Sequence, residues 1–226
     1  MKTLLFKEFK LSIHPLTYFF VALMAMSALS PSFPTFVPLL YFGASYTFLF
    51  IGMNKTTTTN DLLYTCLLPI KREDVVKARV FSTTVLQIFE MVLVFAFFAL
   101  NTFVFQSHGN PQTQGVISIN LNQGIFLLGV YFIALAIYDI VYLPWFYKTG
   151  KSIILNMFVA IFAMTLFAGV FTIIPYFTFK DIITIGGANA NYLLQFGFLL
   201  VGLGIWIGSK VLVIKISTKN LVKLDF

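Results

Sequence analysis

Charged residues are scarce in this sequence of 226 residues. Lys and Arg number 15, Asp and Glu number 8, and together they make up 10% of the chain, whereas 59% is hydrophobic. Soluble domains contain about 25% charged residues, so the composition excludes an ordinary soluble protein and predicts an all-α, polytopic membrane protein. No soluble domain of ordinary size remains once the apolar segments are set aside. Any ATPase or enzymatic module must therefore be a separate chain.

Cysteine and histidine are almost absent as well. The single Cys66 excludes a disulfide framework within one chain. His14 and His108 lie far apart in the sequence and predict no metal site. The net charge of +7 fits the basic cytoplasmic loops of a membrane protein better than nucleic-acid binding. We expect no catalytic residue, no cofactor and no nucleic-acid partner.

Long apolar runs, by contrast, fill most of the chain. A membrane-spanning helix needs about 20 apolar residues. The runs predict six transmembrane helices over residues 15–29, 35–53, 80–105, 124–146, 153–177 and 192–214. On the last of these, Gly204 and Gly208 form a pair of small residues one turn apart. We expect this pair to serve packing within the chain.

An amphipathic stretch, residues 2–14, precedes the first apolar run. Its apolar side chains recur at helical spacing: Leu5, Phe6, Phe9 and Ile13. This pattern predicts a helix on the membrane surface, with a cytoplasmic extension of the first span as the alternative.

The basic residues gather on one side of the predicted topology. With Lys210 counted in the C-terminal tail, all of them except Lys180 fall in the N-terminus, the tail and the segments after spans two and four. The positive-inside rule then places both termini in the cytoplasm.

The longest polar and charged segment is Asn54–Arg79. Asn60 or Asp61 can cap a short helix that Pro69 ends. Its apolar face is formed by Leu63, Cys66 and Leu67. The acidic pair Glu73 and Asp74 then falls in the first turn of the next helix, where it complements the helix dipole. The residues alone support a docking helix for a soluble partner and an ordinary solvated loop equally.

Two stretches resemble a known family. Leu67–Arg79 (LLPIKREDVVKAR) resembles the stretch between spans two and three of ABC-2-type permease subunits, the membrane halves of one class of ABC exporters. Leu143–Gly150 (LPWFYKTG) resembles the signature of that family at the cytoplasmic end of span four. Together with the length and the six spans, the resemblance covers essentially the whole chain. It is nearest to the small Gram-positive exporter type, which includes the phenol-soluble modulin exporter.

The resemblance implies one transmembrane domain, residues 1–226, in a bacterial cell membrane, with residues 54–79 as a cytoplasmic coupling segment. The implied partners are two copies of an ABC ATPase subunit, a second permease subunit, identical or sister, a hydrophobic or amphipathic substrate, and the bilayer. The residues implied to couple to the ATPase are Asp61, Leu62, Leu63, Cys66, Leu67, Leu68, Pro69, Lys71, Arg72 and Glu73. We expect export of amphipathic or antimicrobial peptides. A lipid or small hydrophobic drug is the alternative cargo, and a secondary transporter or channel is the alternative function.

Two carboxylates fall within predicted spans, Glu90 and Asp139. A charge there costs about 2.5–3.5 kcal/mol on insertion scales and often marks function, so both are candidates for a polar path along which substrate passes. The structural alternatives are a protonated Glu90 bonded to a nearby Ser or Thr, and Asp139 bonded to Tyr138 or Tyr142. The predicted spans supply no Lys, Arg or His to complete a proton relay.

Overall fold

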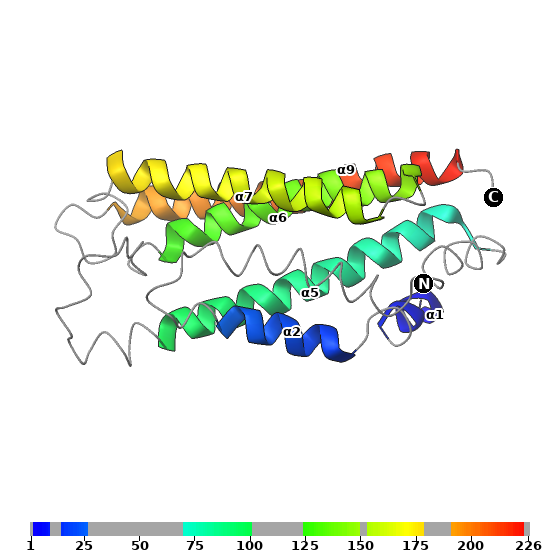
Figure 1. Ribbon diagram of the computed structural model, residues 1–226, viewed down its shortest axis with the longest axis horizontal. Coiled ribbons are helices and arrows are strands. Elements are labelled where there is room, and N and C mark those ends of the chain that lie inside the picture. The colour runs from blue at the N-terminus through cyan, green and yellow to red at the C-terminus, as the bar shows by residue number, and fades with distance from the viewer. Residues whose placement is uncertain are drawn as a thin grey trace.

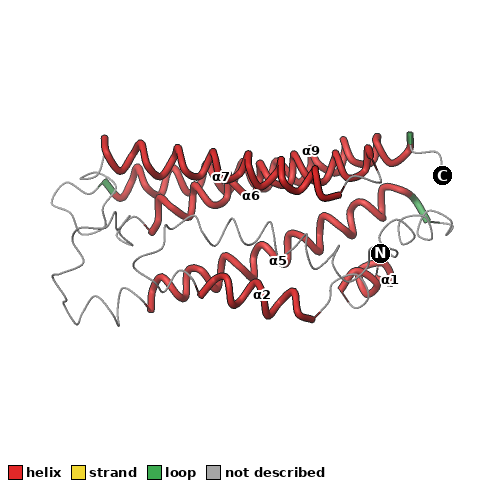
Figure 2. The backbone as a smooth tube through the Cα atoms, in the orientation of Figure 1, coloured by secondary structure: helices red, strands yellow, loops and turns green. Residues whose placement is uncertain are grey.

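The computed structural model describes residues 2–9, 15–26, 70–100, 124–149, 153–178 and 191–223. The helices in this part of the chain are α1 (Lys2–Lys7), α2 (Pro15–Ala25), α5 (Arg72–Leu100), α6 (Gly124–Thr149), α7 (Ile153–Thr178) and α9 (Tyr192–Val222). The described residues contain no strand, as Figure 2 shows. The all-α prediction is therefore confirmed for the part of the chain that is described.

Three of these helices are long and apolar enough to cross a membrane, over Arg72–Phe97, Ile125–Lys148 and Tyr192–Val222. A shorter apolar stretch, Leu155–Phe171, lies in α7. The predicted first span corresponds to α2, which has 11 residues, and the predicted second span, residues 35–53, lies outside the described residues. Six spans therefore stays a prediction, and the polytopic character rests on the three long helices.

The helix α5 begins at Arg72, before the predicted span of residues 80–105, so charged residues of the predicted coupling segment belong to it. The prediction that Glu73 and Asp74 lie in the first turn of this helix, where negative charge offsets the helix dipole, is confirmed. Lys77 Nζ lies 2.6 Å from Glu73 Oε1, one turn away. Local charge pairing thus extends the helix beyond its apolar part, and any motion of this charged turn is carried directly into α5.

The helices form two layers (Figure 1). One layer contains α6, α7 and α9, and the other contains α5 with α1 and α2. Within the first layer α6 packs most extensively against α9, whereas α5 touches α9 more than it touches α6. The start of α5, the end of α9 and the helix α1 lie at the same end of the molecule (Figure 1). Both described ends of the chain therefore lie at one end of the bundle.

Apolar side chains cover the outer surface as well as the core. Large hydrophobic residues such as Phe162, Leu193 and Leu200 are more than half exposed. Monomeric soluble proteins rarely expose so much contiguous apolar surface. Buried aromatic rings meanwhile stack along α6, where Tyr138 contacts Tyr142 and Tyr142 contacts Phe146. This distribution is that of a helix bundle surrounded by lipid.

Two glycines let α6 and α9 touch at their backbones. A Cβ atom added at Gly202 would lie 2.6 Å from the carbonyl oxygen of Gly129. By contrast, Gly204 and Gly208 have open space beside them and are exposed. The prediction that the latter pair serves packing within the chain is wrong, because it lies on the outer face of α9.

The N-terminal helix differs from its predicted amphipathic pattern. Leu4 and Glu8 are buried, whereas Phe6, predicted on the apolar side, is 62% exposed. Phe9 does pack inward, with its ring 6.5 Å from that of Phe81 on α5. The spacing of apolar residues placed Phe6 on the buried side of the helix. It could not predict that Glu8 pairs with Arg79 and therefore turns inward. Residues 10–14 of the predicted surface helix lie outside the described residues.

The glycine contact yields a testable pair of variants. Gly202→Ala should lower the free energy of unfolding by about 1–3 kcal/mol, because the new methyl group meets the backbone of α6 rather than a movable side chain. Gly204→Ala, in open space on the same helix, should raise it by roughly 0.5–1 kcal/mol through helix propensity. A denaturing-detergent titration of both purified variants measures the difference. Equal effects would show that the helices separate easily at Gly202.

Candidate functional site

A polar stripe runs along the inward side of α5. The residues that form it, called here the polar face of α5, are Arg72, Arg79, Thr83, Gln87 and Glu90. At 3.6 residues per turn they lie within about 80° of one another around the helix. Four of them are buried, and Arg72 is half-buried. In a lipid-embedded bundle each polar group has to find a partner inside the protein.

Arg79 fastens the N-terminal helix to α5. Its Nε lies 2.7 Å from Glu8 Oε2, and its Nη2 donates to Glu8 Oε1 over 3.2 Å. Both side chains are less than a tenth exposed. One hydrogen bond and a second close charge contact thus join the buried pair, so the N-terminal segment is tied to α5 by charge as well as by apolar contact.

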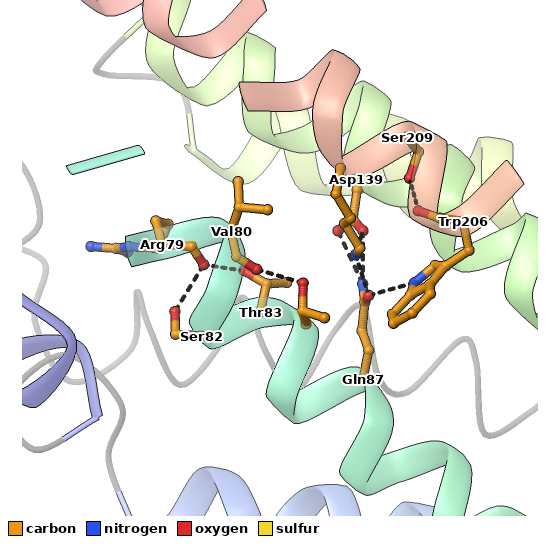
Figure 3. A network of polar contacts seen from close by, with 10 residues as sticks. Arg79, Val80, Ser82, Thr83, Gln87, Asp139, Trp206 and Ser209 are labelled. Atoms are coloured by element: carbon orange, nitrogen blue, oxygen red, sulfur yellow. Dashed lines mark hydrogen bonds and ion pairs between the residues drawn. The ribbon is translucent and has the colours of Figure 1, made fainter. Parts of the chain in front are cut away.

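Thr83 and its neighbours satisfy their hydroxyl groups within α5. Ser82 and Thr83 each donate to the carbonyl oxygen of Arg79 over 2.8 Å, and Thr84 donates to that of Val80 over 2.7 Å. Figure 3 shows these bonds along the helix. Hydroxyl groups bonded in this way need no partner on another helix. In this turn the three hydroxyl groups are satisfied by carbonyl oxygens of α5 itself.

Gln87 joins α5 to both α6 and α9. Its Nε2 donates to the two carboxylate oxygens of Asp139 over 3.0 and 3.1 Å. Its Oε1 accepts from Trp206 Nε1 over 2.9 Å and from Lys210 Nζ over 2.6 Å. Lys210 also forms an ion pair with Asp139 and lies 4.6 Å from the centre of the Trp206 ring. Figure 3 shows Gln87 between Asp139 and Trp206.

These contacts answer two questions that the sequence left open. Asp139 is bound by Gln87 and Lys210, partners that the tyrosine hypothesis did not foresee. Lys210 was counted in the basic tail, but it lies within α9 and points at a fully buried carboxylate. The statement that the spans hold no lysine is therefore wrong. A buried charge pair with its remaining hydrogen bonds satisfied is the arrangement that a low-dielectric interior tolerates.

Arg72 closes the end of α9. Its Nη1 donates to the carbonyl oxygens of Leu221 over 2.9 Å and Val222 over 3.0 Å. The last carbonyls of a helix have no partner within the helix and carry the negative end of its dipole. Asn220 in the same turn donates its amide to the carbonyl oxygen of Pro144 on α6, over 2.8 Å. The first residue of α5 thus holds the end of α9, which in turn holds α6.

Glu90 differs from the other members of the polar face. The carboxylate is 2% exposed, and its Oε2 has no hydrogen-bond partner among the described residues. The hypothesis of a serine or threonine partner is not met at this atom. The hydroxyl of Tyr131 on α6 is likewise buried without a partner in the described part of the chain. Glu90 therefore keeps an unused acceptor inside the bundle.

A comparison with protein families identifies the chain. The family described as ABC-2 family transporter protein matches residues 3–218. The chain belongs to the ABC-2 transporter family. No curated protein and no solved structure matches it. An ABC-2 chain is the membrane component of an ABC transporter and is not itself catalytic, and its family implies an ABC ATPase as partner.

The described part of this ABC-2 chain contains only some of the predicted coupling residues. Asp61, Leu62, Leu63, Cys66, Leu67, Leu68 and Pro69 lie outside the described residues. Lys71 is exposed just before α5, and Glu73 is exposed in its first turn. Arg72 turns its guanidinium toward α9. The described residues hold no group of His, Cys, Asp and Glu able to bind a metal ion. The contacts of the polar face of α5 join α5 to other helices.

The Asp139–Lys210 pair can be tested by removing one partner. Lys210→Met should lower the free energy of unfolding by about 3–5 kcal/mol, because it leaves Asp139 buried and uncompensated. Adding Asp139→Asn should restore part of that loss, since the double variant carries no buried charge. Denaturing-detergent titration of the single and double variants gives both values. Lys215→Met, on the exposed side of the same helix, is the matched control and should change little. A loss at Lys210 no larger than at Lys215 would contradict the pairing.

Proposed function

We propose that this chain is the permease subunit of an ABC exporter and that α5 receives the motion of the ATPase. The observation that carries the proposal is Arg72, which stands where the coupling segment enters α5 and holds the last carbonyls of α9. A push on this segment moves α5 and is felt at the last turn of α9, because the Arg72 side chain connects the two helices. Family membership supports the ATPase as the source of that push.

The polar face of α5 provides the further connections. Arg79 carries the movement to α1 through Glu8. Gln87 carries the movement to α6 through Asp139, and to α9 through Lys210 and Trp206. We propose that closure of two ATPase copies displaces residues 61–79 and shifts α5 against the layer of α6, α7 and α9. A path then opens between this permease and a second one, identical or sister.

The proposed orientation follows the basic residues. The start of α5 and the end of α6 lie at the same end of the bundle as the end of α9 (Figure 1). Lys71 and Arg72 stand at the start of α5, and Lys148 is in the last turn of α6. The positive-inside rule assigns this end to the cytoplasm of a bacterial cell. Both termini are then cytoplasmic, and the coupling segment faces the compartment that holds the ATPase.

The proposed cargo is an amphipathic peptide, as in exporters of the phenol-soluble modulin type. Support comes from the composition of the spans, which are rich in phenylalanine and poor in charge. Of the two intramembrane carboxylates, Glu90 is the better candidate for contact with cargo. Its Oε2 is unused among the described residues, whereas both oxygens of Asp139 accept hydrogen bonds. A lipid or a small hydrophobic drug is the alternative cargo.

One observation favours a second function. The buried Asp139–Lys210 pair is the kind of intramembrane charge pair found in secondary transporters. If this chain worked in that way, it would move its substrate without an ATPase. Transport by the purified chain in vesicles, with and without its ATPase and ATP, separates the two functions. Transport that persists without the ATPase would overturn the exporter proposal.

Docking of the ATPase is tested on the short helix predicted before Pro69. Leu67→Asp should abolish recovery of the ATPase with the tagged permease, because a charge interrupts the apolar contact. Thr65→Asp, on the opposite side of the same predicted helix, is the matched control and should leave recovery unchanged. Quantitative co-purification in mild detergent measures both. Equal recovery in the two variants would remove Leu67 from the docking surface.

The role of Glu90 is tested by Glu90→Gln. The variant keeps shape and acceptor but loses the carboxylate, so assembly with the ATPase should be normal while the export rate of a cationic amphipathic peptide falls several-fold. Transport into inside-out vesicles gives the rate, and co-purification gives assembly. Unchanged export would return Glu90 to a purely structural role.

A further inference from the structure

Three lysines form a row at the end of α9: Lys215 and Lys219 in its last turns, and Lys223 at its C-cap, called here the lysine stripe. The residues are four apart, so they lie one above another on one side of the helix. All three are exposed. The helix contains no Asp or Glu, and none of the three lysines forms an ion pair with another described residue. Like charges at this spacing repel one another, and within the described chain nothing offsets the repulsion.

The stripe points away from the protein. The residues that α9 buries in its last three turns are Val213, Ser217 and Leu221. Each lysine follows one of these by two positions, which is about 200° around the helix. The stripe therefore occupies the face opposite the core. Its neighbours Leu212 and Ile216 are exposed large apolar side chains, as expected for a surface in contact with acyl chains.

The length of α9 places the stripe at the depth of the lipid headgroups. The helix has 31 residues and is about 46 Å long at 1.5 Å per residue. A bilayer measures roughly 40–45 Å with its headgroups and about 30 Å without them. With Tyr192 at one interface, where tyrosine is enriched, the last turns of α9 reach the opposite headgroup layer. Lys210 lies deeper in the bilayer and is paired with Asp139. The lysines of the stripe follow it along α9, at the depth of the headgroups.

We propose that the lysine stripe binds the phosphate groups of anionic phospholipids. The ligand chemistry follows from three exposed ammonium groups in a row that form no ion pair with another described residue. The lipid source follows from their depth and from the exposed apolar residues beside them. A soluble partner would meet the stripe only beyond the membrane, whereas a headgroup lies level with it. The bound lipid offsets the repulsion between the lysines. It also holds the end of α9, which Arg72 connects to the start of α5. This inference depends on α9 spanning the bilayer and not on the cargo.

Binding is measured with the full-length permease in neutral detergent, titrated with phosphatidylglycerol, and with phosphatidylcholine as the uncharged comparison. Each lysine near an anionic surface contributes about fivefold in affinity. Lys215→Gln, Lys219→Gln and Lys223→Gln together should weaken phosphatidylglycerol binding on the order of 100-fold and leave phosphatidylcholine binding unchanged. Replacing the same three residues with arginine should preserve binding, because the charge is retained.

A matched pair of single variants guards against a general effect of charge. Lys219→Gln should weaken binding about fivefold. Lys148→Gln, which removes an exposed lysine from the last turn of α6, should not. Size-exclusion chromatography confirms that the variants are folded. Equal weakening by the two single variants, or unchanged binding in the triple glutamine variant, would overturn the proposal. Loss of the ATPase from the triple variant with lipid binding intact would overturn it in favour of a protein partner.

Discussion

The need to bury the polar face of α5 governs the structure. A lipid-exposed amide or charge has no water to bind, so each such group has to be satisfied inside the protein. One neighbouring helix cannot supply hydrogen-bond partners for all five residues of the polar face, because they are spread along about five turns of α5. Arg79 binds α1, Gln87 binds α6 and α9, Arg72 binds the end of α9, and Thr83 bonds within its own helix. The packing of α5 is thus determined by its polar partners, and the helices that supply them are held in place in return.

The two layers are joined by different physical means. Within one layer, α6 and α9 touch at the backbones of Gly129 and Gly202, a contact that tolerates no displacement without separating the helices. Between the layers, α5 is connected through long side chains such as Gln87 and Arg72. A side chain can follow a small shift of its helix while keeping its hydrogen bonds, whereas a backbone contact cannot. This difference suits a molecule in which α5 moves against a fixed pair of helices.

Much of the fold was readable from the sequence, because apolar length predicts spanning helices directly. The predicted starts at Gly124, Ile153 and Tyr192 are confirmed. The polar face of α5 is also visible in the sequence, because its residues from Arg72 to Glu90 are spaced by seven, four, four and three positions. It was missed because the residues up to Arg79 were assigned to a polar segment and the later ones to a span, so they were not placed on one helix. Glu8 and Lys210 could not be found as partners, since pairing depends on which helices meet. Spacing likewise could not decide between Gly202 and Gly204, because a pattern of small residues does not say which face turns inward.

The two intramembrane carboxylates show why composition alone does not reveal function. Both are buried, and in the sequence both are single acids within predicted spans. Lys210 and Gln87 bind the Asp139 carboxylate, which offsets the cost of burying its charge. Glu90 receives no such partner for its Oε2 within the described residues, although Tyr131 leaves its own hydroxyl unused nearby on the adjacent helix. The proposed contact of Glu90 with cargo would use its Oε2. A shift of α5 against α6 would change access to that acid, because Glu90 and Tyr131 lie on those two helices.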